Sequence, residues 1–244
     1  MKNQFFGDIR DYRKYGLLRI LTRGKKASAA VCWMLTPNVC GAGGNHTKYL
    51  SRPKKWRRFD PDLFDALYKA VIVDGERDVV RAETTNILDP KIFSFYKKLL
   101  TDDLNERREY FQRFASFAKG RDFVFFDPDN GLEVKGPPLG KRNSSKFLYF
   151  EELSKTFSMG HSVLVFQFFT RKKAEDVIAE RTSQIFSCLD VNEIASFKTP
   201  AVIYFLIPQP SHVAEMKERG EQVRQAWPGE ICPVWHSRLD EDRQ

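Results

Sequence analysis

The sequence predicts an α/β protein: a Rossmann-like three-layer sandwich with a mostly parallel sheet and an antiparallel C-terminal hairpin. Short apolar runs alternate with helical patterns along the chain. Residues 123–126 read Phe-Val-Phe-Phe, a run that is too short for a helix and apolar throughout, as expected for a central strand buried on both faces. Farther on, the strand-like segments 191–198 and 201–207 are separated only by Thr199-Pro200, which predicts a hairpin.

The composition suits one folded domain covering residues 1–244, with basic loop insertions near 45–59 and 135–146. The four cysteines lie far apart, which argues against a zinc site and a disulfide framework and favours a reducing cytoplasm. No apolar run is long enough for a membrane span or a signal peptide, so we expect a cytoplasmic protein. The net charge of +8 favours polyanionic partners such as nucleic acid.

In the first half of the chain, an amphipathic helix is expected over residues 8–22, with Asp8 as its N-cap. A buried strand follows at 29–35, and Pro61 begins the next helix. Residues 77–88 predict a strand that ends near Glu83, and residues 91–99 predict a second short strand. Residues 102–118 form an amphipathic pattern that places Leu104, Phe111, Phe114 and Phe117 inward.

In the second half, the pattern predicts a loop at 135–146, a helix at 150–157 and a fully apolar strand at 161–169. A helix over 171–189 leads to the hairpin. A last helix over 211–227 is followed by a polar tail.

The first candidate site is Asp127-Pro128-Asp129-Asn130, directly after the predicted central strand. In open α/β sheets, ligands bind beyond the carboxyl ends of the strands, so these side chains are placed where chemistry is expected. A polar turn that only caps the strand is the alternative.

A second candidate site follows the strand at 29–35. Residues 36–47 contain Thr36, Asn38, Gly41, Gly43 and Gly44, and several glycines after a buried strand allow a backbone to approach a ligand closely. A flexible loop without a ligand is the alternative. His46 in this loop reads as a hydrogen-bonded loop residue.

A basic segment at 48–59 is the third candidate. Its basic side chains neutralise phosphates, and an exposed tryptophan among them offers a surface on which a base can stack. A solvated loop is the alternative. The predicted nucleic-acid contacts are Lys48, Lys54, Lys55, Trp56, Arg57 and Arg58.

Several motifs together resemble the J-type ribosomal RNA adenine-N6 methyltransferases of the large subunit. Gly7, Asp11 and Lys14 in "GDIRDYRKY" keep the spacing of the family's N-terminal G-N-x-x-D-x-x-K-H motif. The loop "TPNVCGAGGNHT" resembles the family's glycine-rich loop, and "DPDN" stands where the family has D-P-P-Y. The hairpin and helix at 201–216 also resemble theirs. Asp129 and Asn130 therefore replace the second proline and the aromatic residue.

The resemblance implies S-adenosylmethionine as cofactor and a nucleic-acid base amine as substrate, with RNA expected rather than DNA. The methyl donor would lie over the glycine loop, and Glu83 would accept its ribose hydroxyls. Asp127 and the Pro128 carbonyl would hold the target amine, beside Asn130, with Phe168 or Phe169 as the aromatic face. Lys14 would reach over the cleft to a phosphate of the target or the carboxylate of the donor.

Three alternatives stay open. Asp129, Glu133 and Lys135 echo the P-D…E-x-K pattern of metal-dependent nucleases, in which two acids hold Mg²⁺ and the lysine polarises a water. The second alternative is a protein that binds nucleic acid without catalysis, on a methyltransferase fold that has lost its activity. For Lys14, the alternative to a role in the site is a surface ion pair with Asp11, three residues earlier.

Overall fold

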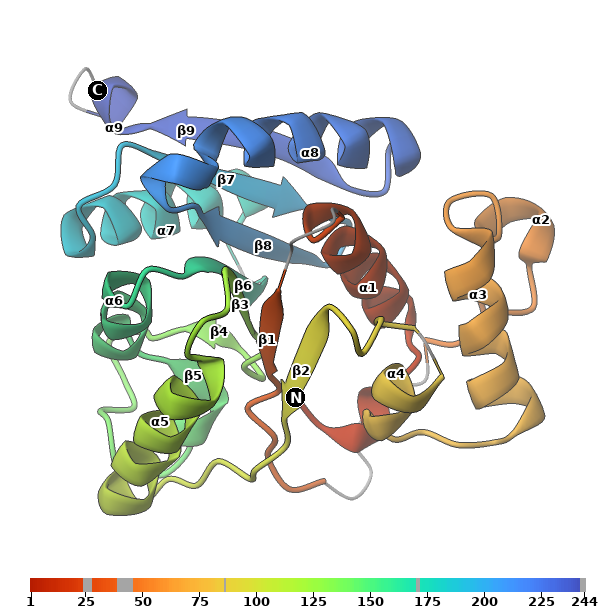
Figure 1. The fold of residues 1–244 in the computed structure, drawn as a ribbon, viewed down its shortest axis with the longest axis horizontal. Helices are drawn as coiled ribbons and strands as arrows, with labels where there is room; N and C mark the ends of the chain where they lie inside the picture. The colour runs from red at the N-terminus through yellow and green to blue at the C-terminus, as the bar shows by residue number, and fades with distance from the viewer. Residues whose placement is uncertain (24–27, 39–45, 86, 170–171, 242–244) are drawn as a thin grey trace.

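A seven-stranded sheet runs through the middle of the molecule and has helices on both faces (Figure 1). The computed structural model describes residues 1–23, 28–38, 46–85, 87–169 and 172–241. Along the sheet the strands are β2 (Phe93–Tyr96), β1 (Ala29–Cys32), β3 (Phe123–Phe126), β6 (Ser162–Phe168), β8 (Val202–Ile207), β7 (Glu193–Lys198) and β9 (Cys232–Ser237). A separate pair of short parallel strands, β4 (Gly131–Leu132) and β5 (Phe147–Leu148), follows β3.

The strand directions confirm the predicted fold class. β2, β1, β3 and β6 are parallel, so β3 lies inside the sheet between β1 and β6. β8 runs antiparallel to β6, and β7 pairs with β8 as the predicted antiparallel hairpin. β9, which pairs with the outer side of β7, was expected as part of a polar tail, and that expectation is wrong.

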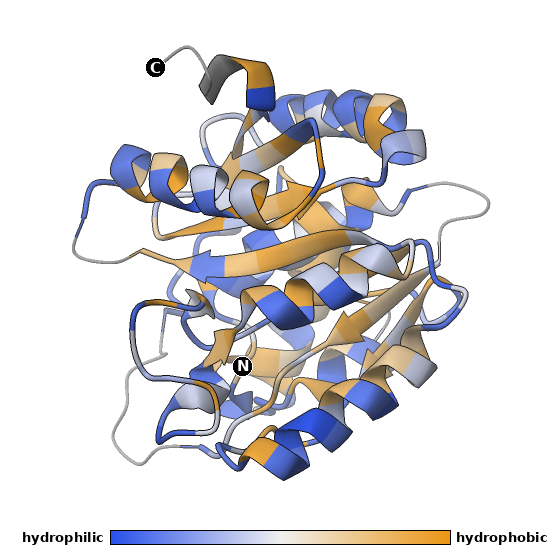
Figure 2. Ribbon diagram, turned by 90° about the vertical axis from the view of Figure 1, so that its left-hand side faces the viewer, coloured by the Kyte–Doolittle hydropathy of each residue, from blue (hydrophilic) through white to orange (hydrophobic). Residues whose placement is uncertain are grey.

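Two apolar cores fill the spaces between the sheet and its helices. In Figure 2 the strands are coloured mainly hydrophobic, whereas the outer helices mix hydrophobic and hydrophilic residues. The first lies under α1 (Ile9–Leu21), α3 (Pro61–Tyr68), α4 (Val80–Thr84) and α8 (Val213–Ala226). The second lies under α5 (Leu104–Ala118), α6 (Phe150–Ser158) and α7 (Ala174–Cys188). The remaining helical turns are η1 (Asn3–Phe5), α2 (Pro53–Trp56), η2 (Lys69–Val73), η3 (Ser144–Lys146), η4 (Pro210–His212) and α9 (Arg238–Glu241). None of the described helices is long and apolar enough to cross a bilayer.

Strand β3 contributes to both cores because successive side chains of a strand point to opposite faces. Phe123 and Phe125 belong to the core beneath α1, whereas Val124 and Phe126 belong to the core beneath α5. The same alternation turns the next residue, Asp127, toward the α1 face. The fold therefore delivers a carboxylate to the N-terminal helix.

Two predicted elements differ in the structure. The strand expected at 77–88 is wrong, since its central residues form the short helix α4, with Val79 and Ala82 buried in the first core. In α5, Phe114 is buried as predicted, but Phe117 is exposed, and Arg107 and Tyr110 are buried instead.

The segment expected as a loop at 135–146 is held in place at its C-terminal end. Asp102 accepts hydrogen bonds from the backbone N–H groups of Asn143 and Ser145, each at 2.7 Å. Arg107 donates to the backbone oxygens of Ser144 and Phe147 at 3.0 and 2.7 Å. This part of the chain thus forms a fixed wall next to the end of β3.

Helix α1 packs closely against the C-terminal part of the chain. A Cβ atom on Gly16 would lie 2.1 Å from Cζ2 of Trp227, so only glycine allows this contact. The ring centroids of Tyr12 and Trp227 lie 4.8 Å apart. Arg13 forms an ion pair with Glu230, and Arg219 donates to the backbone oxygen of Leu21. Contacts with residues 219–230, far away in the sequence, therefore fix the position of α1.

The contact with Trp227 predicts opposite effects for two glycine substitutions in helices. Gly16→Ala should destabilise the protein by about 1–3 kcal/mol, because the added methyl group collides with a buried ring. Gly220→Ala is the matched control: its nearest neighbour would be 3.5 Å away, and it should gain roughly 0.5–1 kcal/mol from helix propensity. Urea denaturation measures both, and a Gly16→Ala variant as stable as the native protein would contradict the packing argument.

Candidate functional site

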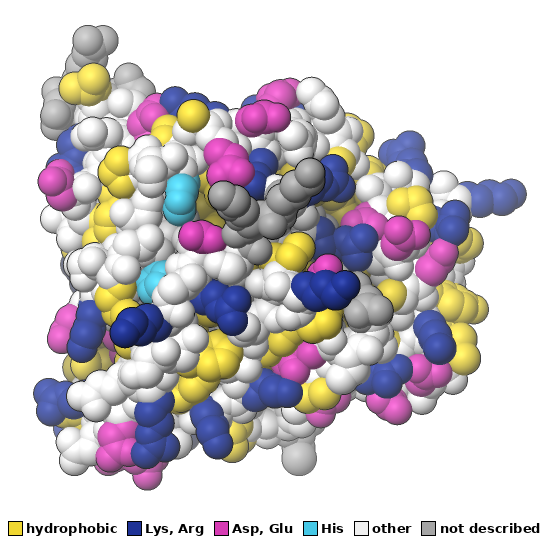
Figure 3. Space-filling model, viewed as in Figure 1, with side chains coloured by type: hydrophobic (Ala, Val, Ile, Leu, Met, Phe, Trp, Pro, Cys, Tyr) yellow, Lys and Arg dark blue, Asp and Glu magenta, His cyan; other side chains and the backbone are white. Residues whose placement is uncertain are grey.

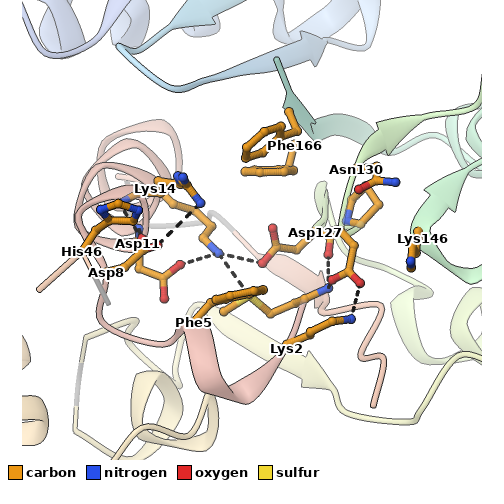
Figure 4. A pocket seen from close by; sticks show the side chains of 15 residues that line it. Lys2, Phe5, Asp8, Asp11, Lys14, His46, Asp127, Asn130, Lys146 and Phe166 are labelled. Atoms are coloured by element: carbon orange, nitrogen blue, oxygen red, sulfur yellow. Dashed lines mark hydrogen bonds and ion pairs between the residues drawn. The ribbon is translucent and has the colours of Figure 1, made fainter. Parts of the chain in front are cut away.

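A cavity of about 410 Å³ opens beyond the carboxyl end of β3 (Figure 4). Its walls are the N-terminal segment with the start of α1, residues 127–130, and the end of β6. The backbone N–H of Asp127 donates to the oxygen of Cys32 at 3.1 Å, which extends the sheet by one residue before Pro128 turns the chain away. The cavity therefore lies where the topology of a parallel sheet places ligands.

Lys14 joins the two sides of this cavity. Its Nζ atom lies 2.7 Å from Oδ2 of Asp127 and 2.7 Å from Oδ1 of Asp11 (Figure 4). Asp11 in turn accepts a hydrogen bond from the backbone N–H of Gly7 at 3.0 Å. The predicted pair with Asp11 thus exists, but it is buried rather than on the surface, and Lys14 contacts Asp127. The three residues of the N-terminal motif converge on the loop after β3.

Burial dominates the electrostatics of the ion trio that Asp11, Lys14 and Asp127 form. Burial raises the pKa of the Asp127 carboxyl and that of Asp11, although the nearby Lys14 ammonium lowers both. Burial opposes the charge on Lys14 as well, but Asp11 and Asp127 outweigh it and raise the pKa of Lys14. Two carboxylates share one ammonium. Oδ1 of Asp127 has no hydrogen-bond partner among the described residues, and Asp127 lines the cavity.

Asp129 has a different surrounding from Asp127. Its carboxylate accepts from Lys2 Nζ at 2.5 Å and from Thr36 Oγ1 at 2.7 Å, and it lies 3.0 Å from the α-amino nitrogen of Met1. Although burial alone would raise the pKa of Asp129, these cations and hydrogen bonds lower it to about 2. Asp129 therefore anchors the N-terminal segment and is occupied by protein contacts.

The predicted cofactor residues are only partly described by the structure. Thr36 is buried and bonded to Asp129, whereas Asn38 is exposed and does not line the cavity. Gly41, Gly43 and Gly44 lie outside the described residues.

Glu83 was expected at a strand end, but it lies in helix α4. Its carboxylate forms an ion pair with Lys97 at 2.6 Å, directly beyond β2, and accepts from Trp33 Nε1 at 3.3 Å. The Glu83 carboxylate thus lies beside the end of β2 even though a helix supplies it. Both of its oxygens have protein partners.

The basic segment around α2 keeps its charges on the surface but not its aromatic residue. The cationic side chains of Lys48, Lys54, Lys55, Arg57 and Arg58 are exposed. The prediction of an exposed Trp56 is wrong: only 8% of it is exposed, because it packs against Tyr49 and Phe59. Arg57 forms an ion pair with Asp65 at 2.7 Å.

Several cavity residues carry no motif that the sequence reveals. Lys2, Arg10 and Lys146 bring cationic groups to its walls. Phe168, considered above as an aromatic face, lines the cavity together with Phe166, and the guanidinium of Arg10 lies 5.1 Å from the ring centre of Phe168. The alternation of side chains along β6 places both rings on one face, which a strand prediction could have indicated.

The residues of the nuclease alternative do not come together. Asp129 lines the cavity beside β3, whereas Glu133 and Lys135 line a different one. Glu133 Oε1 accepts from the backbone N–H of Phe150 at 2.7 Å, at the start of α6. The part of the chain that the structure describes contains no group of three or more His, Cys, Asp or Glu side chains suited to a metal ion.

Comparisons with known proteins add little to this geometry. No family model and no curated protein matches the chain. Among solved structures, protein LPL1258 from Legionella pneumophila str. Philadelphia 1, of the family DUF519, is similar over 95% of this chain and 97% of its own, with 10% identity and a TM-score of 0.48. A likeness of this size says nothing about activity.

The ion trio predicts a large, pH-dependent loss of stability for Lys14→Met. Removing the ammonium leaves two buried carboxylates uncompensated, which costs about 3–5 kcal/mol. Burial already raises the pKa of Asp127 and that of Asp11, and the loss of the ammonium raises both pKa values further. Because the folded state then binds more protons than the unfolded state, the loss should be smallest below the ordinary Asp pKa and grow as the pH rises through the raised values.

Urea denaturation at pH 5 and pH 8 measures this loss. The control is Lys97→Met, which breaks the partly exposed pair with Glu83 and should cost no more than about 1 kcal/mol at either pH. A Lys14→Met loss that is equally small, or independent of pH, would contradict the proposed compensation.

Proposed function

We propose that the protein is an S-adenosylmethionine-dependent methyltransferase that methylates an exocyclic amine of a nucleic-acid base. The observation that carries the proposal is the Asp127 carboxylate. It is buried at the end of the central parallel strand, is fixed by Lys14 through one oxygen, and has its other oxygen available in a cavity of about 410 Å³. Cavities of this size take small ligands or single nucleotide units.

Asp127 can orient an amine without acting as a strong base. Its available oxygen and the Pro128 carbonyl would accept two N–H hydrogen bonds from the target, which leaves the nitrogen lone pair pointing away from them. Lys14 keeps the carboxylate charged in spite of its burial. After nitrogen gains the methyl group, Asp127 is placed to accept the proton that the nitrogen loses.

The described walls of the cavity fit a methyl donor in two respects. S-adenosylmethionine, when bound, supplies a methyl group on a positively charged sulfur, and Asp8, Asp11 and Asp127 provide negative charge at the wall. The rings of Phe5, Phe166 and Phe168 offer aromatic faces, which attract cations and stack on planar groups. Of the predicted cofactor residues described, Thr36 and Glu83 already have protein partners.

Charge supports nucleic acid as the substrate. Arg10 and Lys146 line the cavity. The exposed basic side chains around α2 belong to the segment that follows His46 in the sequence, and His46 also lines the cavity. On the face drawn in Figure 3, however, Lys and Arg side chains are spread among Asp and Glu side chains rather than gathered in one patch. We therefore propose that contacts close to the cavity, and not a broad basic surface, select the substrate, with RNA preferred.

Asp127→Asn tests the proposed chemistry. We expect methyl transfer from labelled donor to fall by ~10²-fold or more, because an amide is a weaker hydrogen-bond acceptor for the target amine than a carboxylate is. The melting temperature should change little, because the amide keeps the shape of the carboxylate and Lys14 keeps its ion pair with Asp11. Asp60→Asn is the control: Asp60 caps α3 and pairs with Arg19 outside the cavity.

Total RNA, DNA and small amines serve as substrates in the first assay, and calorimetry measures donor binding separately. Donor binding with no transfer to any of them would favour the non-catalytic alternative. Full activity of Asp127→Asn would remove Asp127 from the chemistry.

Phe168→Leu tests the aromatic face. Stacking on a base contributes about 1–3 kcal/mol, so the KM for the nucleic acid should rise roughly tenfold while kcat changes little. Phe117→Leu is a matched control, since the two rings are 37% and 36% exposed and Phe117 lies on α5, away from the cavity. Equal KM values for both variants would mean that the base stacks elsewhere.

A further inference from the structure

One buried charge in the described part of the chain has no opposite charge beside it. Nine charged side chains are buried, and eight of them form ion pairs, including Lys14, Arg13, Arg107 and Arg219. The ninth is Arg181 of α7, which is 3% exposed and forms none among the described residues. A buried charge is normally paired, because leaving it alone costs several kcal/mol.

Toward the described residues, Arg181 donates hydrogen bonds from one of its terminal nitrogens. Nη1 donates to the backbone oxygen of Glu133 and to Oε1 of Gln184, both at 2.7 Å. Nε and Nη2 have no hydrogen-bond partner among the described residues. These two atoms form one edge of the guanidinium, the edge that binds the paired oxygens of a phosphate or carboxylate.

Arg181 lines a cavity of about 690 Å³ between α7, the start of α6 and residues 133–135. Val177, Glu180, Arg181 and Gln184 line it because they share one face of α7. Lys135 adds an exposed cation without an ion-pair partner among the described residues, and Val134 and Phe150 add apolar surface. The cavity is separate from the one beside Asp127.

The two carboxylates of this cavity do not satisfy Arg181. Glu133 points its Oε1 to the backbone N–H of Phe150 at 2.7 Å, and Glu180 pairs with Lys172 at 2.6 Å. Burial lowers the pKa of Arg181, and the charges of Glu180 and Glu133 oppose that effect. Among the described residues, no carboxylate therefore forms an ion pair with Arg181.

We propose that this cavity binds a phosphate group, held by the guanidinium edge of Arg181 and by Lys135, with an apolar part of the same ligand against Val134 and Phe150. Two cations suit a doubly charged phosphomonoester better than a carboxylate. The inference does not depend on the proposed methyltransferase activity, and the two can fail separately.

Thermal melting at constant ionic strength, adjusted with sodium chloride, tests the site. Inorganic phosphate should raise the melting temperature of the native protein with saturation, and phenyl phosphate should do so at lower concentration because of the apolar wall. Acetate is the comparison for a carboxylate. Arg181→Met should abolish the rise, and Lys135→Gln, on the surface, should weaken phosphate binding by ~10-fold. Arg142→Gln, an exposed arginine outside this cavity, should change nothing.

A second readout separates a ligand site from a structural arginine. Without phosphate, Arg181→Met should melt no lower than the native protein, since it removes an unpaired buried charge, whereas Arg107→Met should melt lower because it leaves Glu152 alone. If Arg181→Met does not fold, Lys135→Gln decides the question. The proposal is overturned if phosphate leaves the native melting temperature unchanged, if Arg142→Gln weakens the response as much as Lys135→Gln, or if acetate acts as strongly as phosphate.

Discussion

The shared ammonium of Lys14 is the interaction on which the candidate site depends. It compensates one carboxylate on its own helix and another at the end of β3, both buried. Because an uncompensated carboxylate in this position would cost several kcal/mol, α1 cannot move away from β3 without a large loss. The ion trio thus holds the N-terminal helix to the central strand, together with the contacts of α1 to Trp227 and Glu230. All three residues of the trio line the cavity, so its walls depend on their electrostatics.

Much of the fold could be predicted because local patterns and tertiary packing agree there. The apolar run of β3 and the Asp8 N-cap of α1 are confirmed. The prediction that α1 is amphipathic is wrong, because most of its residues are buried, including Asp11, Arg13 and Lys14. Prediction failed where packing overrides local preference. The β-branched residues near Val79 and Val80 favour a strand, yet burial of Val79 and Ala82 against the sheet produces a helix. Strand β9 is half-exposed and becomes visible only through its pairing with β7.

The site was predictable only to the level of its motifs. Asp127 and Lys14 were singled out from their positions in the chain, and the structure brings them together across 113 residues. The partners of Asp129 were not foreseen, because Lys2 and Thr36 approach it from segments that share no pattern with it. Trp56 was misread because hydrophilic neighbours suggested exposure, whereas its contacts with Tyr49 and Phe59 bury it. Sequence patterns locate groups along the chain, but long-range ion pairs decide which groups remain available.

The packing of α1 against Trp227 also has a consequence for biosynthesis. Gly16 and Arg13 contact Trp227 and Glu230, which are made after every strand of the sheet except β9. On the ribosome, the first helix is therefore present while most of its contacts on this side are missing. At roughly 5–20 residues per second, the hundred residues between Asp127 and these contacts take on the order of ten seconds to synthesise. During that interval the nascent chain carries Lys14 and Asp127 without the support that holds their helix, so a chain truncated before Trp227 would be a substrate for chaperones rather than an assembled site.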